Sequence, residues 1–140
     1  FSHDSAIRED GFTEEETKMI QETRKIFRTP ELKIVATTIR VPVLRAHSES
    51  IVVDFERPLS EEEAREILKK APGVEVVDRR KENYFPMPIE ASGKDNILVG
   101  RIRKDPSSEN GLAFFVSGDQ LRKGAALNAV QISEILFKKH

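Results

Sequence analysis

Residues 34–50 read IVATTIRVPVLRAHSES, and they join two strand-like runs across a proline. β-Branched residues dominate residues 32–41 and 50–55, so each run is predicted to be a strand. Pro42 has no backbone N–H to donate and is expected to end strand pairing between the two runs. The stretch therefore predicts two strands with an interruption between them.

Two side chains in this stretch, Arg40 and His47, are candidate residues of a binding or catalytic site. On one straight strand their odd separation would place them on opposite faces, about 23 Å apart. The residues leave two interpretations open. Either Arg40 extends from a strand end and His47 forms a hydrogen bond in a turn, or a bend between Val41 and Ala46 brings both side chains to one site. The residues alone favour the first interpretation, because functional histidines are a minority.

Capping boxes mark the start of two predicted helices. Thr13 and Glu16 form one box and Ser60 and Glu63 the other, because each side chain can accept the partner's backbone N–H. Three helices are expected, at residues 13–27, 60–71 and 118–139.

The remaining apolar runs predict three more strands, at residues 74–77, 97–103 and 112–116. Residues 78–96 show little periodicity and are expected to form a long surface excursion. The order of elements predicts an α+β fold with a mixed, mostly antiparallel sheet and helices on one face, in a single domain of residues 1–140. The other sheet face is left uncovered, and a homodimer is expected to bury it.

The composition excludes several classes of protein. The net charge of -1 gives no general attraction to nucleic acid or to anionic membranes, and no apolar run approaches the roughly 20 residues of a membrane span. The sequence contains no cysteine, and its three histidines have no metal-ligand spacing, so no metal site is expected. Glycine-rich phosphate-binding motifs are missing, so a complete nucleotide-binding domain is not encoded here.

Four further residues form two candidate sites, each with a structural alternative. Glu15 and Lys18 share one helix face, where they could bind one ligand or form an exposed ion pair worth about 0.2–0.5 kcal/mol. Glu14 is equally well placed to pair with Lys18. Gly124 inside a helix costs about 1 kcal/mol relative to Ala, so something is expected to approach it closely. That neighbour is either another helix or a cofactor with Asn128 as its amide contact.

Four motifs carry a resemblance to a known enzyme family: E-E-E-T-K, T-x-I-R-V-P-V-L-R-A-H-S-E, V-G-R-I-R-x-D and L-R-K-G-A-A-L-N-A-V-Q. Together they resemble the C-terminal half of aspartate-semialdehyde dehydrogenase and cover nearly the whole chain. The resemblance implies the C-terminal domain fold of glyceraldehyde-3-phosphate dehydrogenase-like enzymes. It also implies that aspartate 4-semialdehyde, NADP and phosphate are converted reversibly into 4-phosphoaspartate and NADPH, in lysine, methionine and threonine biosynthesis. The implied location is the cytoplasm, or a plastid in a eukaryote.

The resemblance also implies a role for each candidate residue. By motif position, His47 resembles the family's general acid and base, and Arg40 resembles the arginine that binds the substrate α-carboxylate. Glu15 resembles the carboxylate that binds the substrate amino group, and Lys18 the ammonium that binds phosphate. The residues expected beside the nicotinamide of NADP are Gly124 and Asn128.

The family's nucleophilic cysteine, its partnering glutamine and its N-terminal NADP-binding domain would all precede Phe1. The chain is therefore expected to be a catalytic and dimerisation fragment that has no dehydrogenase activity alone. Two alternatives stay open. One is a non-catalytic dimerisation module of the same fold, favoured by the missing cysteine. The other is an enzyme like N-acetylglutamyl-phosphate reductase, which would not need Glu15 for a free amine.

Overall fold

The structure is a computed structural model that describes residues 6–138. Contacts between residues divide the chain into two compact units, Phe1–Pro42 and Val43–His140. The boundary lies inside the stretch that joins the two predicted strands, directly after Pro42. Each unit is described by itself.

The first unit contains helix α1, Glu14–Phe27, which begins at the predicted capping box. The Glu16 N–H donates to Thr13 Oγ1 at 3.2 Å, and the Thr13 N–H donates to Glu16 Oε2 at 2.9 Å. These backbone hydrogen bonds satisfy donors that a helix N-terminus otherwise leaves unpaired. The helix ends at Arg28, whose φ of +56° is in the left-handed region. The prediction of this helix is confirmed.

The strand predicted at residues 32–41 is wrong: all ten residues are described, and none belongs to a strand of the sheet. Two hydrogen bonds join this segment to α1. The Thr38 N–H donates to Glu16 Oε1 at 2.8 Å, and the Leu32 carbonyl accepts from Arg24 Nε at 2.9 Å. β-Branched residues favour an extended backbone, but only a partner strand makes it part of a sheet.

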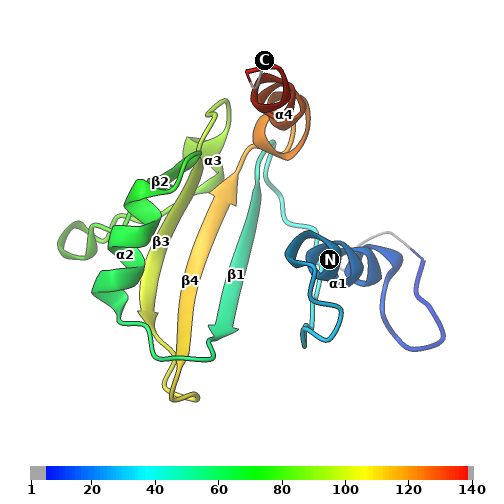
Figure 1. The fold of residues 1–140 in the computed structure, drawn as a ribbon, viewed down its shortest axis with the longest axis horizontal. Helices are drawn as coiled ribbons and strands as arrows, with labels where there is room; N and C mark the ends of the chain where they lie inside the picture. Colours follow the sequence, from blue (N-terminus) through cyan, green and yellow to red (C-terminus); the bar gives the residue numbers. More distant parts are fainter. Residues whose placement is uncertain (1–5, 139–140) are drawn as a thin grey trace. The chain divides into compact units, whose positions relative to one another are not determined.

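The second unit contains one four-stranded sheet with the strand order β1-β4-β3-β2 (Figure 1). Its strands are β1 His47–Asp54, β2 Val74–Val76, β3 Ile97–Lys104 and β4 Gly111–Gly118. β4 pairs antiparallel with both β1 and β3, whereas β2 pairs parallel with β3. The predicted mixed, mostly antiparallel sheet is therefore confirmed, although β1 begins three residues before the predicted strand.

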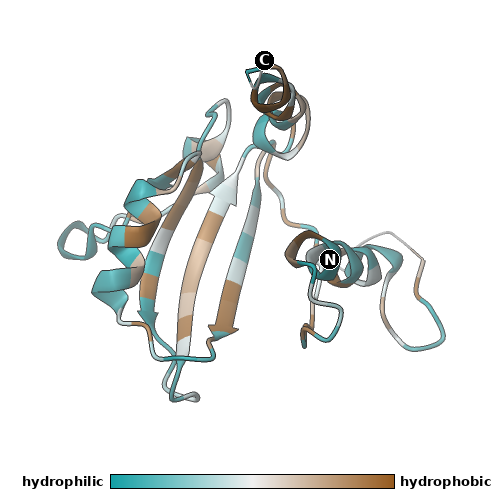
Figure 2. Ribbon diagram, viewed as in Figure 1, coloured by the Kyte–Doolittle hydropathy of each residue, from teal (hydrophilic) through white to brown (hydrophobic). Residues whose placement is uncertain are grey.

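Helix α2, Glu61–Lys70, packs on one face of this sheet and begins at the second predicted capping box. Ala64 is buried against Val99, Ile102 and Leu112, and partly buried apolar side chains surround this cluster. Figure 2 shows the hydrophilic residues of α2 on its outer side. Burying one large aliphatic side chain contributes about 1.5–3 kcal/mol, so this contact stabilises the unit substantially.

Residues 78–96 lie mostly at the surface, as predicted, but part of the segment packs on the sheet. They include a 3₁₀ turn, Arg80–Glu82, and the short helix α3, Pro88–Ala91, whose Ala91 is completely buried with Leu98 of β3. A Cβ at Gly100 would lie 2.1 Å from the Val77 carbonyl oxygen, so this stretch approaches β3 closely. The segment therefore covers part of the sheet face opposite α2.

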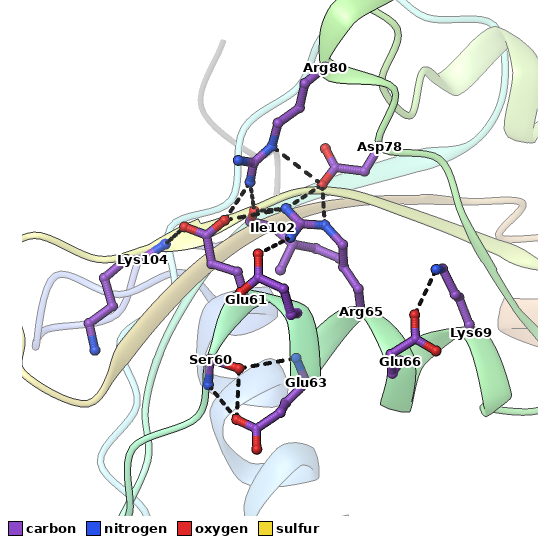
Figure 3. Close-up of polar contacts among 11 residues, drawn as sticks. Ser60, Glu61, Glu63, Arg65, Glu66, Lys69, Asp78, Arg80, Ile102 and Lys104 are labelled. Atoms are coloured by element: carbon purple, nitrogen blue, oxygen red, sulfur yellow. Dashed lines mark hydrogen bonds and ion pairs between the residues drawn. The ribbon is translucent and has the colours of Figure 1, made fainter.

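A polar cluster of Glu61, Arg65, Asp78 and Arg80, called the Asp78 cluster below, stabilises a bulge in β3 (Figure 3). The buried Asp78 carboxylate accepts the N–H of Arg101 at 3.0 Å and Nη2 of Arg65 at 2.9 Å. At this bulge Arg101 has a φ of +54°, which is uncommon for a residue with a side chain. The cluster thus satisfies a backbone amide that the bulge removes from the regular ladder.

The chain after β4 begins with a π-helical turn, Arg122–Ala126, and continues as α4, Leu127–Phe137. The predicted helix at 118–139 therefore starts later than expected, and its last residue lies outside the described residues. Figure 2 shows hydrophobic residues along α4. Its large apolar side chains are exposed within this chain, namely Val130, Ile132, Ile135, Leu136 and Phe137.

Candidate functional site

His47 is the first residue of β1 and has an exposed side chain. It pairs with Gly118 of β4, so no side chain stands opposite it on the neighbouring strand. Its carbonyl oxygen accepts the hydroxyl of the fully buried Ser117 at 3.3 Å, and this hydroxyl also lies 3.0 Å from Ser48 Oγ. The backbone of His47 is therefore bonded to the sheet while its imidazole stays accessible.

The residues directly before His47 form a constrained turn. Ala46 is buried, has a φ of +81°, and donates its N–H to Gln120 Oε1 at 2.8 Å. A positive φ in a residue with a Cβ costs about 1–2 kcal/mol, so surrounding contacts must stabilise this conformation. The turn determines the direction in which the chain enters β1 at His47.

Asp119 is the most heavily hydrogen-bonded side chain near this turn. Its Oδ2 accepts Arg45 Nη2 at 2.7 Å and the Gly93 N–H at 2.7 Å. Its Oδ1 accepts the N–H groups of Leu121 at 2.9 Å and Arg122 at 3.1 Å. We call this carboxylate with its four donors the Asp119 cluster. It joins the turn before β1, the end of α3 and the start of the terminal helical segment.

These contacts determine the ionisation of Asp119. Burial alone would raise the pKa of its carboxyl group, but the Gly93 N–H, the Arg45 guanidinium and two further backbone N–H groups favour the charged form. Together they lower the pKa of Asp119 to about 2. The carboxylate is therefore charged throughout the neutral range and forms a fixed ion pair with Arg45.

Sequence reasoning missed Asp119, Gln120 and Arg45. A local signal existed, because an aspartate after a glycine and before a helical run is a typical cap whose side chain accepts nearby backbone N–H groups. The contact with Arg45 had no such signal, since the two residues lie far apart in the sequence.

Glu15 and Lys18 lie together on α1, where Lys18 Nζ is 3.6 Å from Glu15 Oε1. Both side chains are more than one-third exposed, so the structural alternative of a surface ion pair is present in the molecule. This geometry is also compatible with ligand binding, because an exposed pair can exchange its partner at low cost. Arg40 is exposed in the same unit.

The backbone has local bends at Pro42, Leu44 and Arg45, so Arg40 and His47 do not occupy one straight strand. They belong to different units of the chain, and their cooperation stays a prediction.

Gly124 and Asn128 lie four residues apart in the terminal helical segment, and both are exposed. A Cβ at Gly124 would meet Gln120 Cβ at 3.6 Å, which is an ordinary contact. Within the described chain, tight packing therefore does not explain this glycine, and the expected close neighbour is not found here. The surface beside Gly124 and Asn128 is open.

Comparison with known proteins agrees with the fold. Residues 3–123 match the family model described as "Semialdehyde dehydrogenase, dimerisation domain". Aspartate-semialdehyde dehydrogenase of Synechocystis sp. is 54% identical over 99% of this chain, and that of Aquifex aeolicus is 53% identical over 98%. The chain spans 41% and 40% of these two relatives, respectively.

A solved structure has a similar fold. Aspartate semialdehyde dehydrogenase II from Vibrio cholerae, complexed with ASA, superposes with a TM-score of 0.93 and 38% identity. The match covers all of this chain and 41% of that protein. The fold, the family model and the curated relatives agree, and the chain belongs to the semialdehyde dehydrogenase dimerisation-domain family.

Proposed function

We propose that this chain is the C-terminal part of an NADP-dependent aspartate-semialdehyde dehydrogenase. The complete enzyme would convert aspartate 4-semialdehyde, NADP and phosphate reversibly into 4-phosphoaspartate and NADPH, in the biosynthesis of lysine, methionine and threonine. The observation that carries this proposal is the 54% identity to a relative of that name across nearly the whole chain. The chain contains no cysteine. It would therefore supply only part of the active site, without the nucleophile.

His47 is proposed as the general acid and base. An imidazole can accept and return a proton near neutral pH, and this one is exposed at the start of a strand with a well-bonded backbone. It would take the proton of the nucleophile that the rest of the enzyme supplies, and return it to a reacting oxygen or leaving group. Its placement on a sheet limits its movement between these two steps.

Arg40, Glu15 and Lys18 are proposed to bind the substrates. The planar guanidinium of Arg40 suits a bidentate contact with the substrate α-carboxylate. Glu15 would bind the substrate ammonium group and Lys18 the phosphate, each replacing part of the exposed ion pair seen between them.

NADP, when bound, accepts the hydride in the reaction. The residues of this chain that fit beside it are Gly124 and Asn128, because both are exposed and a Cβ at Gly124 would make only ordinary contacts outside its own helix backbone. The side-chain amide of Asn128 can donate and accept hydrogen bonds, as recognition of a carboxamide requires. Most of the nucleotide would be bound by the N-terminal domain.

The complete protein is proposed to be a homodimer, and the family model's description as a dimerisation domain supports this. In residues 6–138, no helix has the length and apolar character needed to cross a membrane. The cytoplasmic or plastid location stays a prediction.

The experiment that tests the proposed roles uses point variants of the complete enzyme. His47→Ala should lower kcat about 10²–10⁴-fold, because general acid–base catalysis contributes about that much. Arg40→Leu and Glu15→Gln should mainly raise KM for the semialdehyde. Glu14→Gln is the matched control, since it lies at the same helix start without the proposed role, and its kinetics should stay normal. Unchanged kinetics for His47→Ala and Arg40→Leu would refute the assignment.

The rival proposal is a non-catalytic dimerisation module, and the missing cysteine is the observation that favours it. NADPH formation from the semialdehyde by this chain alone would contradict our expectation that the fragment is inactive. A gel-filtration mass together with the coding sequence upstream of Phe1 separates the two proposals. An upstream cysteine and nucleotide-binding loop would support the enzyme, and their absence would support the module.

A further inference from the structure

We infer that Asp119 is a positioning residue for His47, acting through Arg45 and the turn at Ala46. The inference rests on the proposed function only in giving His47 a role in proton transfer. The physical part concerns how the backbone of His47 is placed, and it stands on contacts within one unit of the chain.

The His47 side chain is exposed at the start of β1. Among residues 6–138, the structure shows no hydrogen bond from the imidazole to another side chain or to the backbone. In this unit the ring's position therefore depends on the backbone at His47. A general base needs its ring placed accurately, because a displacement of about 1 Å can cost on the order of 100-fold in rate.

Asp119 and its neighbours hold this backbone from the turn before β1 and from the end of β4. Arg45, two residues before His47, pairs with the Asp119 carboxylate at 2.7 Å. Ala46, which lies between Arg45 and His47 in the sequence, donates its N–H to the side chain of Gln120, the residue after Asp119. On the other strand, Gly118 pairs with His47 and directly precedes Asp119. The start of β1 and the end of β4 are thus joined through one buried carboxylate.

The Asp119 carboxylate is chemically suited to holding this backbone. Its side chain is 0% exposed, and its two oxygens accept four hydrogen bonds from three separate segments. A fully bonded carboxylate has little freedom to rotate, and charge-assisted bonds are the strongest of their kind. The Arg45 side chain is 37% exposed, so without Asp119 it could turn toward solvent and release the turn.

The chain supplies a matched control in Asp78. Asp78 is also buried, also pairs with an arginine, and also accepts the N–H of a residue with positive φ, but that residue is Arg101 in the bulge of β3. A purely structural aspartate should resemble Asp78 in every measurement. A positioning residue should differ from it in kcat and in the environment of His47.

The test compares Asp119→Asn with Asp78→Asn in the complete enzyme. Asn keeps the side-chain shape but removes the charge and replaces one acceptor by a donor. We expect Asp119→Asn to lower kcat about 10–100-fold with KM changed less than about threefold. Asp78→Asn should lower the melting temperature but leave the kcat of the folded enzyme within about twofold of wild type.

A second readout does not depend on activity. With histidine ring nitrogens labelled, the NMR signal of His47, assigned by its loss in His47→Ala, should shift or broaden in Asp119→Asn and stay unchanged in Asp78→Asn. If His47→Ala retains full activity, the proposed catalytic role fails, but the NMR comparison still decides whether Asp119 positions the ring. The two failures are therefore distinguishable.

Arg45→Gln decides the question if Asp119→Asn does not fold. It removes the same ion pair by replacing the more exposed partner. It should produce the same loss in kcat and the same shift or broadening of the His47 NMR signal. Where both variants fold, the double variant should lose no more activity than Asp119→Asn alone, because the two residues act as a unit. Equal kcat in all folded variants, with the His47 signal unmoved, would overturn the inference.

Discussion

The second unit contains two aspartates with buried side chains, Asp119 at the end of β4 and Asp78 beside the bulge of β3, and both accept hydrogen bonds from an arginine and from the backbone. Asp119 and Asp78 each pair with an arginine, and each carboxylate accepts the N–H of a residue with a left-handed backbone, Gly93 or Arg101. They differ in their donors. Asp119 accepts three backbone N–H groups, whereas side-chain guanidinium groups supply most of the bonds in the Asp78 cluster.

This difference shows what each cluster stabilises. Backbone donors from separated segments make Asp119 a junction between chain segments, beside the exposed His47. The Asp78 cluster joins α2 to β3, since Arg65 of α2 also donates to the Ile102 carbonyl at 2.7 Å. One cluster lies beside the candidate site, and the other supports the packing of helix on sheet (Figure 3).

The largest effect on stability is expected from breaking the Asp78 cluster at its central arginine. Arg65→Met keeps the aliphatic stem against the sheet but leaves the buried Asp78 without its closest cation. Removing one partner of a buried pair costs on the order of 3 kcal/mol. Urea unfolding of the variant and wild type measures this loss.

The control for this prediction is Lys69→Met, which removes an exposed ion pair with Glu66 on the same helix. It should change the free energy of unfolding by less than about 1 kcal/mol. Equal losses in the two variants would show that the Asp78 cluster stabilises α2 no more than a surface pair does.

The parts of this fold that could be predicted from the sequence are those made by neighbouring residues. The capping boxes at Thr13 and Ser60 were found because their partners lie three residues away. β3 and β4 were found because their apolar residues fill a buried sheet. In both cases the stabilising contacts follow from local spacing.

The parts that could not be predicted depend on contacts distant in the sequence. Residues 32–41 look like a strand, but Thr38 donates its N–H to Glu16, far back in α1. The pairing of Arg45 with Asp119 spans most of the second unit. A pattern of neighbouring residues cannot predict either contact, because the two partners are far apart in the sequence. The roles of Arg40, Glu15 and Lys18 come from the resemblance and stay predictions.

The ionisation of Asp119 should make the stability of the second unit depend on pH. The folded-state pKa of this residue, about 2, lies below the value of 3.8 for a free carboxyl group, so ionisation favours the folded state. This contribution is fully present above about pH 5 and is lost as the pH falls from about 4 to about 2. Asp119→Asn should therefore melt below wild type at pH 6, and the difference should decrease toward pH 2.

Melting temperatures of both proteins between pH 2 and pH 6 measure this dependence. Ser117→Ala is the control, since it removes a buried hydrogen bond beside the same turn without a titrating group. Its difference from wild type should be nearly constant over this range. If the difference in melting temperature between Asp119→Asn and wild type were constant over this pH range, ionisation of Asp119 would not stabilise the folded protein.

The smallest effect is expected from Ala46→Gly, which tests the backbone of the turn itself. Glycine removes the cost of a positive φ, about 1–2 kcal/mol, but it loses more entropy on folding, about 0.5–1 kcal/mol. It also removes a methyl group that is buried with Val77, Ala91 and Leu98, worth about 0.8 kcal/mol. These terms nearly cancel, so urea unfolding should show a change below about 0.5 kcal/mol. Ala46→Val is the matched comparison variant. A β-branched residue tolerates a positive φ poorly, so this variant should have a clearly lower free energy of unfolding than wild type. If both variants were equally stable, the Asp119 cluster would not be imposing the left-handed turn before His47.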